Sequence, residues 1–480
     1  MKKLEKITPW NEDFAKWYVD VIKQAEFMEY GPIKGTIYFK PNSFALWEKI
    51  QENLNKYFKQ HNVKNVYFPL LIPQSFINKE KEHVKGFAPE LLTITHAGEK
   101  KLAEELYVRP TSEVLFADCF KKELANNNQL PLIYNQWTSV LRWEKNTNPF
   151  LRTTEFLWQE GHTVHTNAEE AQKLARTMIE VYKDFIENYL AIPVIVGNKT
   201  ERERFAGAVE TYTVEAMMKD GKALQSGTSH YLGQNFSKSF DIIFKNTNNE
   251  FENPYQTSWG VSTRLIGGLI MTHGDDRGVI IPPKIAPVQI DILVLFSNKN
   301  PIVSKTAQQI FEKLRTKFTP RIDASDNQPG YKASRSEVLG TPLRIEVGPR
   351  DLEKNQVTLV RRDTLEKYQV DVEKVFEKVE FLLDDIQNNL YNQAKTRLVN
   401  NLDTALNYEE FKSKIAQNKF VIIPFEANEE IEEQIQAETG ATTRCIPINL
   451  EIVNELKKIN NKCFFTNKTT NRFVIFAKAY

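Results

Sequence analysis

The chain has 480 residues, of which 41% are hydrophobic and 11% aromatic, enough to build two or three domains with packed cores. Its 63 Lys and Arg residues almost balance 62 Asp and Glu residues, and a net charge of +1 excludes attraction of nucleic acid by the whole molecule's field. Three widely separated cysteines exclude a disulfide framework, and no apolar run approaches the ~20 residues of a membrane span. The charged start MKKLEKITPW lacks the apolar core of a signal peptide, so we expect a soluble, cytoplasmic protein.

Two helices and two strands are predicted near the start of the chain, and the first strand is Gly35–Lys40. Thr8 is typical of a helix cap, and the helix that it begins is expected to reach about Met28. Ser43 is predicted to cap a second helix with one apolar face, and Val66–Phe68 form a strand. The polar segment Lys81–Leu106 is expected to be irregular.

The sequence RPTSE at residues 109–113 precedes a helix that is predicted to run through Phe120. Thr111 can cap this helix, and Glu113 would then lie in its first turn. Taken alone, this chemistry of a helix start is more common than a ligand site.

A β-hairpin with a long loop is predicted from Arg142 to His162, because strand-forming aromatic residues flank a segment rich in Asn and Pro. Arg142 and Arg152 bracket its loop, and Glu144 and Glu155 accompany them. The hairpin is either half-buried with ordinary surface ion pairs or the site of a planar, charged ligand. In the second case guanidinium groups would bind phosphate, a glutamate would bind an exocyclic amine, and aromatic side chains would form walls.

An amphipathic helix is predicted at Ala168–Leu190, followed by a buried strand at Ile192–Gly197. The sequence LQSGTSHYLG then begins at Leu224, and its small residues allow a backbone to pass close to a ligand. His230 lies in this run and is equally typical of a hydrogen-bonded core histidine. No third metal ligand accompanies His162 and its near neighbour His165.

The segment Trp259–Ile281 is predicted to hold a strand and then an apolar helix that carries Arg264. A cation in such apolar surroundings needs a partner, which could be a bound phosphate or an internal carboxylate.

Pro282 and Pro283 mark a domain boundary, after which strands and helices alternate as in a small α/β domain. Residues 301–367 contain 13 basic and 9 acidic residues, an excess of +4 that suits either an RNA-binding surface or a solvated face. A long helix is predicted at about Val372–Leu398. The last domain then begins near Asn401, with a strand, a Glu-rich helix and a final strand.

Three stretches follow the order of motifs 1, 2 and 3 of class II aminoacyl-tRNA synthetases: the helix and strand before Pro69, the Arg142–His162 hairpin, and the strand and helix with Arg264. In detail RPTSE, RWE…FLRTTEFLWQEGH, GTSHYLGQNFS and LRIEVGPRD resemble prolyl-tRNA synthetases of the archaeal and eukaryotic type, along essentially the whole chain. The resemblance implies ATP-dependent attachment of L-proline to tRNA(Pro) through prolyl-adenylate, with release of pyrophosphate and AMP. It also implies a homodimer.

The fold class that the resemblance implies has three parts. Residues 1–284 would form an α+β catalytic domain with a mixed, mainly antiparallel sheet. Residues 285–390 would form an α/β anticodon-binding domain, and residues 391–480 a small α/β C-terminal domain.

The family's site residues can be assigned on this chain at the positions where its motifs match. Those expected to hold proline are Thr111, Glu113, Arg142, Trp158, Glu160 and His230. Those expected to contact ATP are Arg142, Glu144, Arg152, Thr153, Gln225, Thr228, Ser262 and Arg264, with the Mg²⁺ that accompanies ATP near Gln225. Arginine suits the guanine N7 and O6 edge and carboxylates suit base amino groups, so the expected anticodon readers are Arg344, Glu346, Arg350 and Asp351.

The chain departs from the family pattern at the cysteines that bind zinc in many members. Glu426 stands where the first cysteine pair is expected, and Phe465 replaces the partner of Cys463. One thiolate cannot form a structural zinc site, so no zinc is predicted. About a hundred residues separate His162 from Ser262, which matches the spacing of members without the bacterial editing insertion.

Two other classes of protein fit the sequence less well. A threonyl-tRNA synthetase would place a Cys/His/His zinc site in its pocket, which Cys119 and the scattered histidines do not reproduce. A catalytically inactive tRNA-binding relative would tend to lose the phosphate-binding arginines, whereas Arg142, Arg152 and Arg264 are all present.

Overall fold

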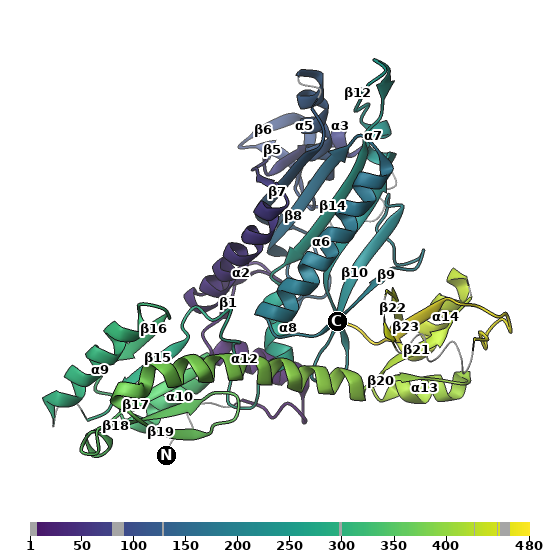
Figure 1. Cartoon of the computed structure of the whole chain (residues 1–480). Helices are drawn as coiled ribbons and strands as arrows, with labels where there is room; N and C mark the ends of the chain where they lie inside the picture. The colour runs from purple at the N-terminus through teal and green to yellow at the C-terminus, as the bar shows by residue number, and fades with distance from the viewer. Residues whose placement is uncertain are drawn as a thin grey trace.

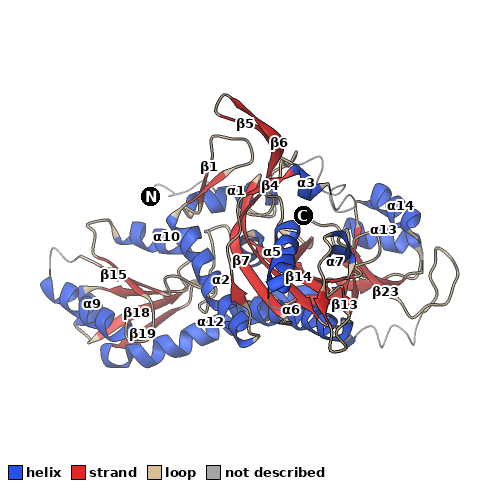
Figure 2. Cartoon of the chain, turned by 90° about the horizontal axis from the view of Figure 1, so that it is seen from above, coloured by secondary structure: helices blue, strands red, loops and turns tan. Residues whose placement is uncertain are grey.

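The computed structural model describes residues 7–78, 91–126, 129–296, 300–426, 428–448, 450–451 and 461–480. A large central sheet lies between a separate five-stranded sheet on one side and the C-terminal helices on the other (Figures 1 and 2).

The first helix begins later than the sequence suggested. Helix α1 spans Phe14–Gln24, and Asp13 caps it by accepting a hydrogen bond from the Lys16 amide at 2.9 Å. Thr8 instead donates its hydroxyl to Asp20 at 2.8 Å. Strands β1 (Met28–Tyr30) and β2 (Ile37–Phe39) form a short hairpin before helix α2 (Pro41–Gln60). Ser43 lies within α2, where it donates to the Phe27 carbonyl at 2.5 Å rather than capping the helix.

Eleven strands of the described residues make up the central sheet, in the order β20-β21-β23-β22-β9-β10-β11-β14-β8-β7-β3. Neighbours are antiparallel except for the parallel pairs β3–β7 and β20–β21. The bounds are β3 (Lys64–Asn65), β7 (Leu132–Leu141), β8 (Glu155–His165), β9 (Val194–Asn198), β10 (Glu210–Met217), β11 (Ala223–Gly233), β14 (Tyr255–Ser262), β20 (Leu402–Thr404), β21 (Phe420–Pro424), β22 (Thr442–Pro447) and β23 (Phe473–Ala477).

The predicted hairpin is confirmed, because β7 and β8 pair from Leu132↔Val164 to Leu141↔Glu155. The predicted amphipathic helix is confirmed as α6 (Ala168–Tyr189), which crosses one face of the central sheet and buries its apolar side there (Figure 1). Tyr212 and Val214 of β10 join this core. The alternate residues of β10 therefore face the opposite side of the sheet, where the candidate site lies.

The remaining helices that the described residues of this part form are α3 (Gln74–Ile77), α5 (Glu113–Asn126), α7 (Asn235–Ser239) and α8 (Arg264–His273). Strands β4 (Leu71–Pro73), β5 (Thr93–Ala97) and β6 (Lys100–Val108) form a small sheet in the order β4-β6-β5, and β12 (Phe244–Lys245) pairs with β13 (Phe251–Glu252). The prediction that residues 81–106 are irregular is thus wrong over 93–106, while residues 81–90 lie outside the described residues. Most side chains of β5 and β6 are exposed on both faces, so no apolar alternation marks these strands.

A separate α/β unit follows, as predicted. Its sheet has the order β16 (Pro320–Asp323), β15 (Ile290–Val294), β17 (Leu343–Val347), β18 (Gln356–Arg361) and β19 (Lys367–Asp371). Helices α9 (Pro301–Leu314), α10 (Pro329–Leu339) and α11 (Pro349–Leu352) accompany it.

Helix α12 (Val375–Asn400), after a 3₁₀ turn at Val372–Lys374, runs from this unit toward the C-terminal helices α13 (Tyr408–Ala416) and α14 (Glu429–Thr439) (Figure 1). The predicted boundary at residue 390 falls inside α12, and the domain limits stay a prediction. The C-terminal strands extend the central sheet rather than forming a sheet of their own. No helix in the described part of the chain is long and apolar enough to cross a membrane.

Candidate active site

A cavity of about 280 Å³ opens on the face of the central sheet opposite α6. Ten of the thirteen side chains predicted to bind proline or ATP line it: Thr111, Glu113, Arg142, Trp158, Glu160, Gln225, Thr228, His230, Ser262 and Arg264. These residues come from segments more than 150 positions apart along the chain.

Strand register explains how they meet. Across β8, β14, β11 and β10 one row runs Glu160, Gly260, Thr228 and Thr213, and the next runs His162, Ser258, His230 and Thr211. Trp158 lies opposite Ser262 in a third row. Side chains in register on neighbouring strands point to the same face, so the β-pairing itself builds the floor of the cavity.

One end of the cavity is acidic. Glu113 begins helix α5 and accepts a hydrogen bond from the Thr111 hydroxyl at 2.5 Å. Glu113 is only 7% exposed, and the N-terminus of a helix favours a negative charge. The pair of Thr111 and Glu113 offers acceptor oxygens to a bound ammonium group.

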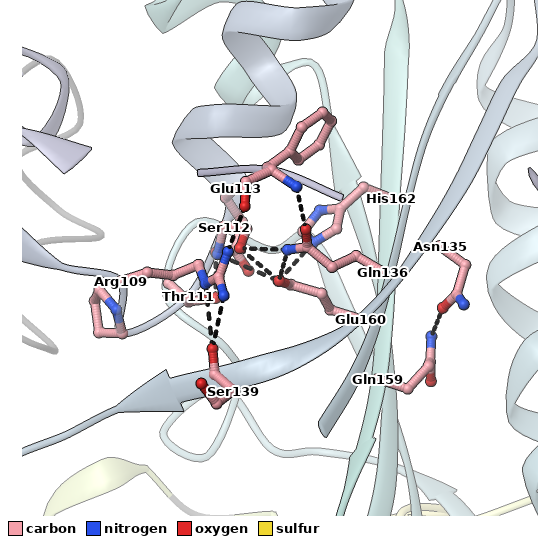
Figure 3. A network of polar contacts seen from close by, with 12 residues as sticks. Arg109, Thr111, Ser112, Glu113, Asn135, Gln136, Ser139, Gln159, Glu160 and His162 are labelled. Carbon is pink, nitrogen blue, oxygen red and sulfur yellow. Dashed lines mark hydrogen bonds and ion pairs between the residues drawn. The ribbon is translucent and has the colours of Figure 1, made fainter. Parts of the chain in front are cut away.

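Glu160 has a different environment in the wall behind this pair (Figure 3). Its two carboxylate oxygens lie 2.5 Å from the Ser112 hydroxyl, 2.8 Å from the Gln136 amide nitrogen and 3.2 Å from Nε2 of His162. Glu160 is 2% exposed, so protein groups rather than solvent surround its carboxylate. The sequence motif identified Glu160, but nothing local pointed to Ser112 or Gln136 as its supports.

Arg142 and His230 are held by aromatic neighbours. Arg142 donates from Nε to the Pro110 carbonyl at 3.1 Å, and its guanidinium lies 5.4 and 5.6 Å from the Phe156 and Trp158 ring centres. His230 stacks on Phe205 with 4.5 Å between ring centres, and its Nδ1 lies 3.0 Å from the Thr211 hydroxyl. The sequence did not single out Phe205 or Thr211, because both contacts depend on strand and loop placement.

The other end of the cavity is basic. Arg264, the first residue of α8, donates to the backbone carbonyls of Leu151 at 3.2 Å and Gln225 at 3.4 Å. Of the two partners that the sequence left open, the internal carboxylate is excluded within the described residues, since none lies within 4.0 Å of this guanidinium. Burial, followed by the nearby cations Arg152 and Arg142, lowers the pKa of Arg264 to about 10. Its environment therefore favours an incoming anion such as phosphate.

The other three predicted ATP contacts lie outside this cavity on the hairpin loop. Arg152 is half exposed, 3.8 Å from Glu144, and lines an adjoining cavity of about 210 Å³ together with Arg264. Thr153 is 2% exposed and donates its hydroxyl to the Glu155 carbonyl at 2.7 Å, which fixes the loop. Tyr480, the last residue, also lines the adjoining cavity and donates to Asp220 at 2.6 Å.

The predicted anticodon readers lie in β17 (Arg344 and Glu346) and in α11 (Arg350 and Asp351). Arg344 is buried and binds Glu337 at 2.6 Å and Glu346 at 2.8 Å, which occupies its guanidinium within the protein. Arg350 is exposed, and Asp351 accepts from the Thr358 hydroxyl at 2.8 Å.

No group of three or more His, Cys, Asp or Glu side chains is placed to hold a metal ion in the part of the chain that the structure describes. Cys463 is fully buried among the aromatic residues of the C-terminal domain. The absence of zinc stays a prediction.

Comparison with known proteins identifies the chain's relatives. Residues 96–273 match the tRNA synthetase class II core domain (G, H, P, S and T), and residues 285–382 match the anticodon binding domain. Residues 408–480 match the family described as Prolyl-tRNA synthetase, C-terminal. The proline--tRNA ligase of Mycoplasmopsis synoviae (strain 53) is 58% identical over 487 residues, covering 100% of both chains. The chain belongs to the prolyl-tRNA synthetases. The proline--tRNA ligase of Alkaliphilus oremlandii (strain OhILAs) is 49% identical over 479 residues, covering 99% of this chain and 98% of the relative.

Membership of the prolyl-tRNA synthetases confirms the predicted fold class: a class II catalytic core, an anticodon-binding domain and a C-terminal domain. The roles of the individual site residues stay predictions.

Proposed function

We propose that the chain attaches L-proline to tRNA(Pro) in two steps and consumes ATP. The observation that carries this function is one cavity lined both by the Glu113 carboxylate, with the Thr111 hydroxyl beside it, and by the Arg264 guanidinium. A free amino acid and a nucleoside triphosphate need opposite charges in this way, and the comparisons support proline as the amino acid.

Proline binds with its secondary ammonium on Glu113 and the Thr111 hydroxyl, and its carboxylate on Arg142. Trp158 and the stacked rings of His230 and Phe205 enclose its ring. The apolar walls suit the methylene groups of proline, while the charged groups fix its orientation.

ATP extends toward Arg264, and Arg152 reaches its triphosphate from the hairpin loop beside Glu144. Gln225, Thr228 and Ser262 line the path between the two substrates. Gln225 lines the cavity and would offer a neutral oxygen ligand to the Mg²⁺ that accompanies ATP, which would neutralise phosphate charge.

In the first step a proline carboxylate oxygen attacks the α-phosphorus and pyrophosphate leaves, which gives prolyl-adenylate. In the second step a ribose hydroxyl of the terminal tRNA adenosine attacks the activated carbonyl and AMP leaves. The protein supplies no nucleophile. Its residues align the two reactants and stabilise the charge that develops on the phosphate.

Proline-dependent exchange of pyrophosphate into ATP tests this function. Exchange is expected with proline, weakly with alanine and not with threonine, because a pocket rejects a smaller substrate by only about 1–3 kcal/mol per methylene. Exchange with threonine instead would indicate a threonyl enzyme, and no exchange with any amino acid would favour a tRNA-binding protein without catalysis.

We also propose the archaeal and eukaryotic subtype without an editing insertion. Between β8 and β14 the chain forms only α6, β9, β10, β11, α7 and the short β12–β13 hairpin. Alanyl-tRNA(Pro) is therefore expected to persist with this chain at about its spontaneous rate of hydrolysis. Acid-gel assay of the preformed ester would show this, and rapid deacylation would contradict the proposal.

A homodimer and anticodon readers complete the proposal. Exposed apolar side chains at Tyr67, Leu70 and Leu71, in the region of motif 1, suit contact with a second copy, which sedimentation velocity would detect.

Among the proposed anticodon readers, Arg350 and Asp351 are better placed than the buried Arg344 to meet bases, and Glu346 lies beside them near the end of β17.

A further inference from the structure

The C-terminal domain is built into the sheet that carries the active site. Strand β22 pairs with β9 through Ile446↔Asn198 and Pro447↔Gly197, beside β10 (Figure 1). A Cβ atom on Gly197 would lie 2.6 Å from both Cys445 Cβ and the Ile446 carbonyl oxygen, so only glycine allows this approach. Strand β9 leads directly into Lys199, which lines the cavity.

A buried ion cluster joins the two domains at this point. Arg444 of β22 donates from Nε at 3.0 Å and Nη2 at 2.8 Å to one carboxylate oxygen of Glu215. Lys199 Nζ and the Thr213 hydroxyl each donate to the other oxygen at 2.9 Å. Arg444, Glu215 and Lys199 are all at most 6% exposed. Burial alone would raise the pKa of Glu215, but the two cations outweigh it and keep this pKa below its usual value.

The cluster lies against the nucleotide end of the cavity. Glu215 is opposite Gln225 in the β10–β11 register, and Thr213 is opposite Thr228. Arg444 is also among the cations that lower the pKa of Arg264. An arginine of the C-terminal domain thus contacts Glu215 and lies close enough to Arg264, in the wall where the phosphates are proposed to bind, to affect its charge.

A second contact fixes the loop that follows Lys199. The hydroxyl of Thr200 lies 3.0 Å from a carboxylate oxygen of Glu432 in α14, and Thr443 of β22 binds the same oxygen at 3.0 Å. Glu432 is 4% exposed, so this contact is part of the domain interface.

We propose that Arg444 is a positioning residue for adenylate formation: it orients Glu215, which in turn fixes Lys199 in the wall at the nucleotide end. The inference rests on the proposed function and assigns the C-terminal domain a direct part in it. The buried Lys199 ammonium needs an anionic partner in a fixed place, which is the Glu215 carboxylate. The two hydrogen bonds from Arg444 keep this carboxylate oriented toward Lys199.

The test compares full-length Arg444→Met and Arg444→Lys with the wild type in proline-dependent pyrophosphate exchange. Methionine keeps an unbranched apolar chain but loses both donors, and we expect kcat/KM for ATP to fall about 10- to 100-fold, since small misplacement of reacting groups has such effects. Lysine restores one charge and is expected to recover part of the loss. In a separate aminoacylation assay, the KM for tRNA(Pro) is expected to stay unchanged.

The matched control is Lys414→Met in the same domain. Lys414 binds Asp403 at 3.1 Å and Glu410 at 2.7 Å but lies outside the cavity. Adenylate burst amplitude counts the folded sites in each variant, so that misfolding lowers the amplitude while mispositioning raises KM for ATP. If Arg444→Met does not fold, the test rests on Arg444→Lys, for which the inference expects a raised KM for ATP.

An unchanged KM for ATP and kcat per active site in the arginine variants, or a change equal to that of Lys414→Met, would overturn the inference. The proposed function would stand in that case. Wild-type protein without proline-dependent exchange would instead refute the proposed function itself.

Discussion

Replacing Arg264 with methionine is expected to lower kcat/KM for ATP in pyrophosphate exchange by about 100- to 1,000-fold, the range found when one preorganised donor to a developing anion is removed. The physical reason is the lack of a carboxylate partner within 4.0 Å among the described residues, combined with two backbone carbonyls that aim the guanidinium into the cavity. The KM for proline is expected to change little, because Arg264 lies at the end away from Glu113.

The same replacement is expected to leave the melting temperature equal or higher at neutral pH. The folded state lowers the pKa of Arg264 to about 10, so folding opposes the charged form, and this cost is present at every pH below about 10. It is relieved only as the pH rises from about 10 toward the unfolded pKa. Removing the cation removes the cost, as for other residues whose placement serves activity rather than stability.

Arg152→Ala provides the comparison. Arg152 is half exposed and only 3.8 Å from Glu144, so its loss is expected to raise the KM for ATP with a smaller fall in kcat than Arg264→Met. Thermal unfolding followed by fluorescence measures the melting temperature, and pyrophosphate exchange measures KM and kcat for ATP. A large loss of stability in Arg264→Met with a normal KM for ATP would show that Arg264 is structural.

The parts of the fold that the sequence predicts well carry a strong local signal. Helix α6 ends one residue before its predicted end at Leu190. The hairpin predicted at Arg142–His162 also forms, but its first strand β7 ends at Leu141, before the predicted range begins. The cavity residues lie in short motifs, which the resemblance located without any knowledge of register.

Other features depend on contacts between distant segments, for which a single sequence has no periodic signal. Ser112 and Gln136 support Glu160 only because β7, β8 and the start of α5 meet. The pairing of β22 with β9 joins residues about 250 positions apart, so the sequence indicated a separate C-terminal domain rather than an extension of the central sheet. Asp13 and Thr8 are both acceptable helix caps by residue type. The Thr8 hydroxyl donates to Asp20, and Asp13 is the residue that caps α1.

Glu113→Gln is expected to reduce kcat/KM for proline by about 30- to 1,000-fold, the cost of removing one charge from a desolvated ionic contact. Glutamine keeps the size of the side chain and can still accept from the Thr111 hydroxyl, so the cavity keeps its shape. Stability is expected to fall by about 0.3–1 kcal/mol, since the favourable interaction of a carboxylate with the α5 N-terminus is lost.

Glu160→Gln, in the same wall of the cavity, distinguishes a residue that binds proline from one that stabilises the fold. Its carboxylate accepts from Ser112 and Gln136, and an amide would turn an NH₂ group toward one of these donors. This variant is therefore expected to lose more stability than Glu113→Gln, by about 1–3 kcal/mol, with a smaller change in the KM for proline per folded site. Denaturant unfolding and proline-dependent exchange on both proteins measure the contrast. Should Glu113→Gln bind proline normally while Glu160→Gln does not, Glu160 would be the residue that binds the ammonium group. Thr111 and Glu113 would then serve only to stabilise the start of helix α5.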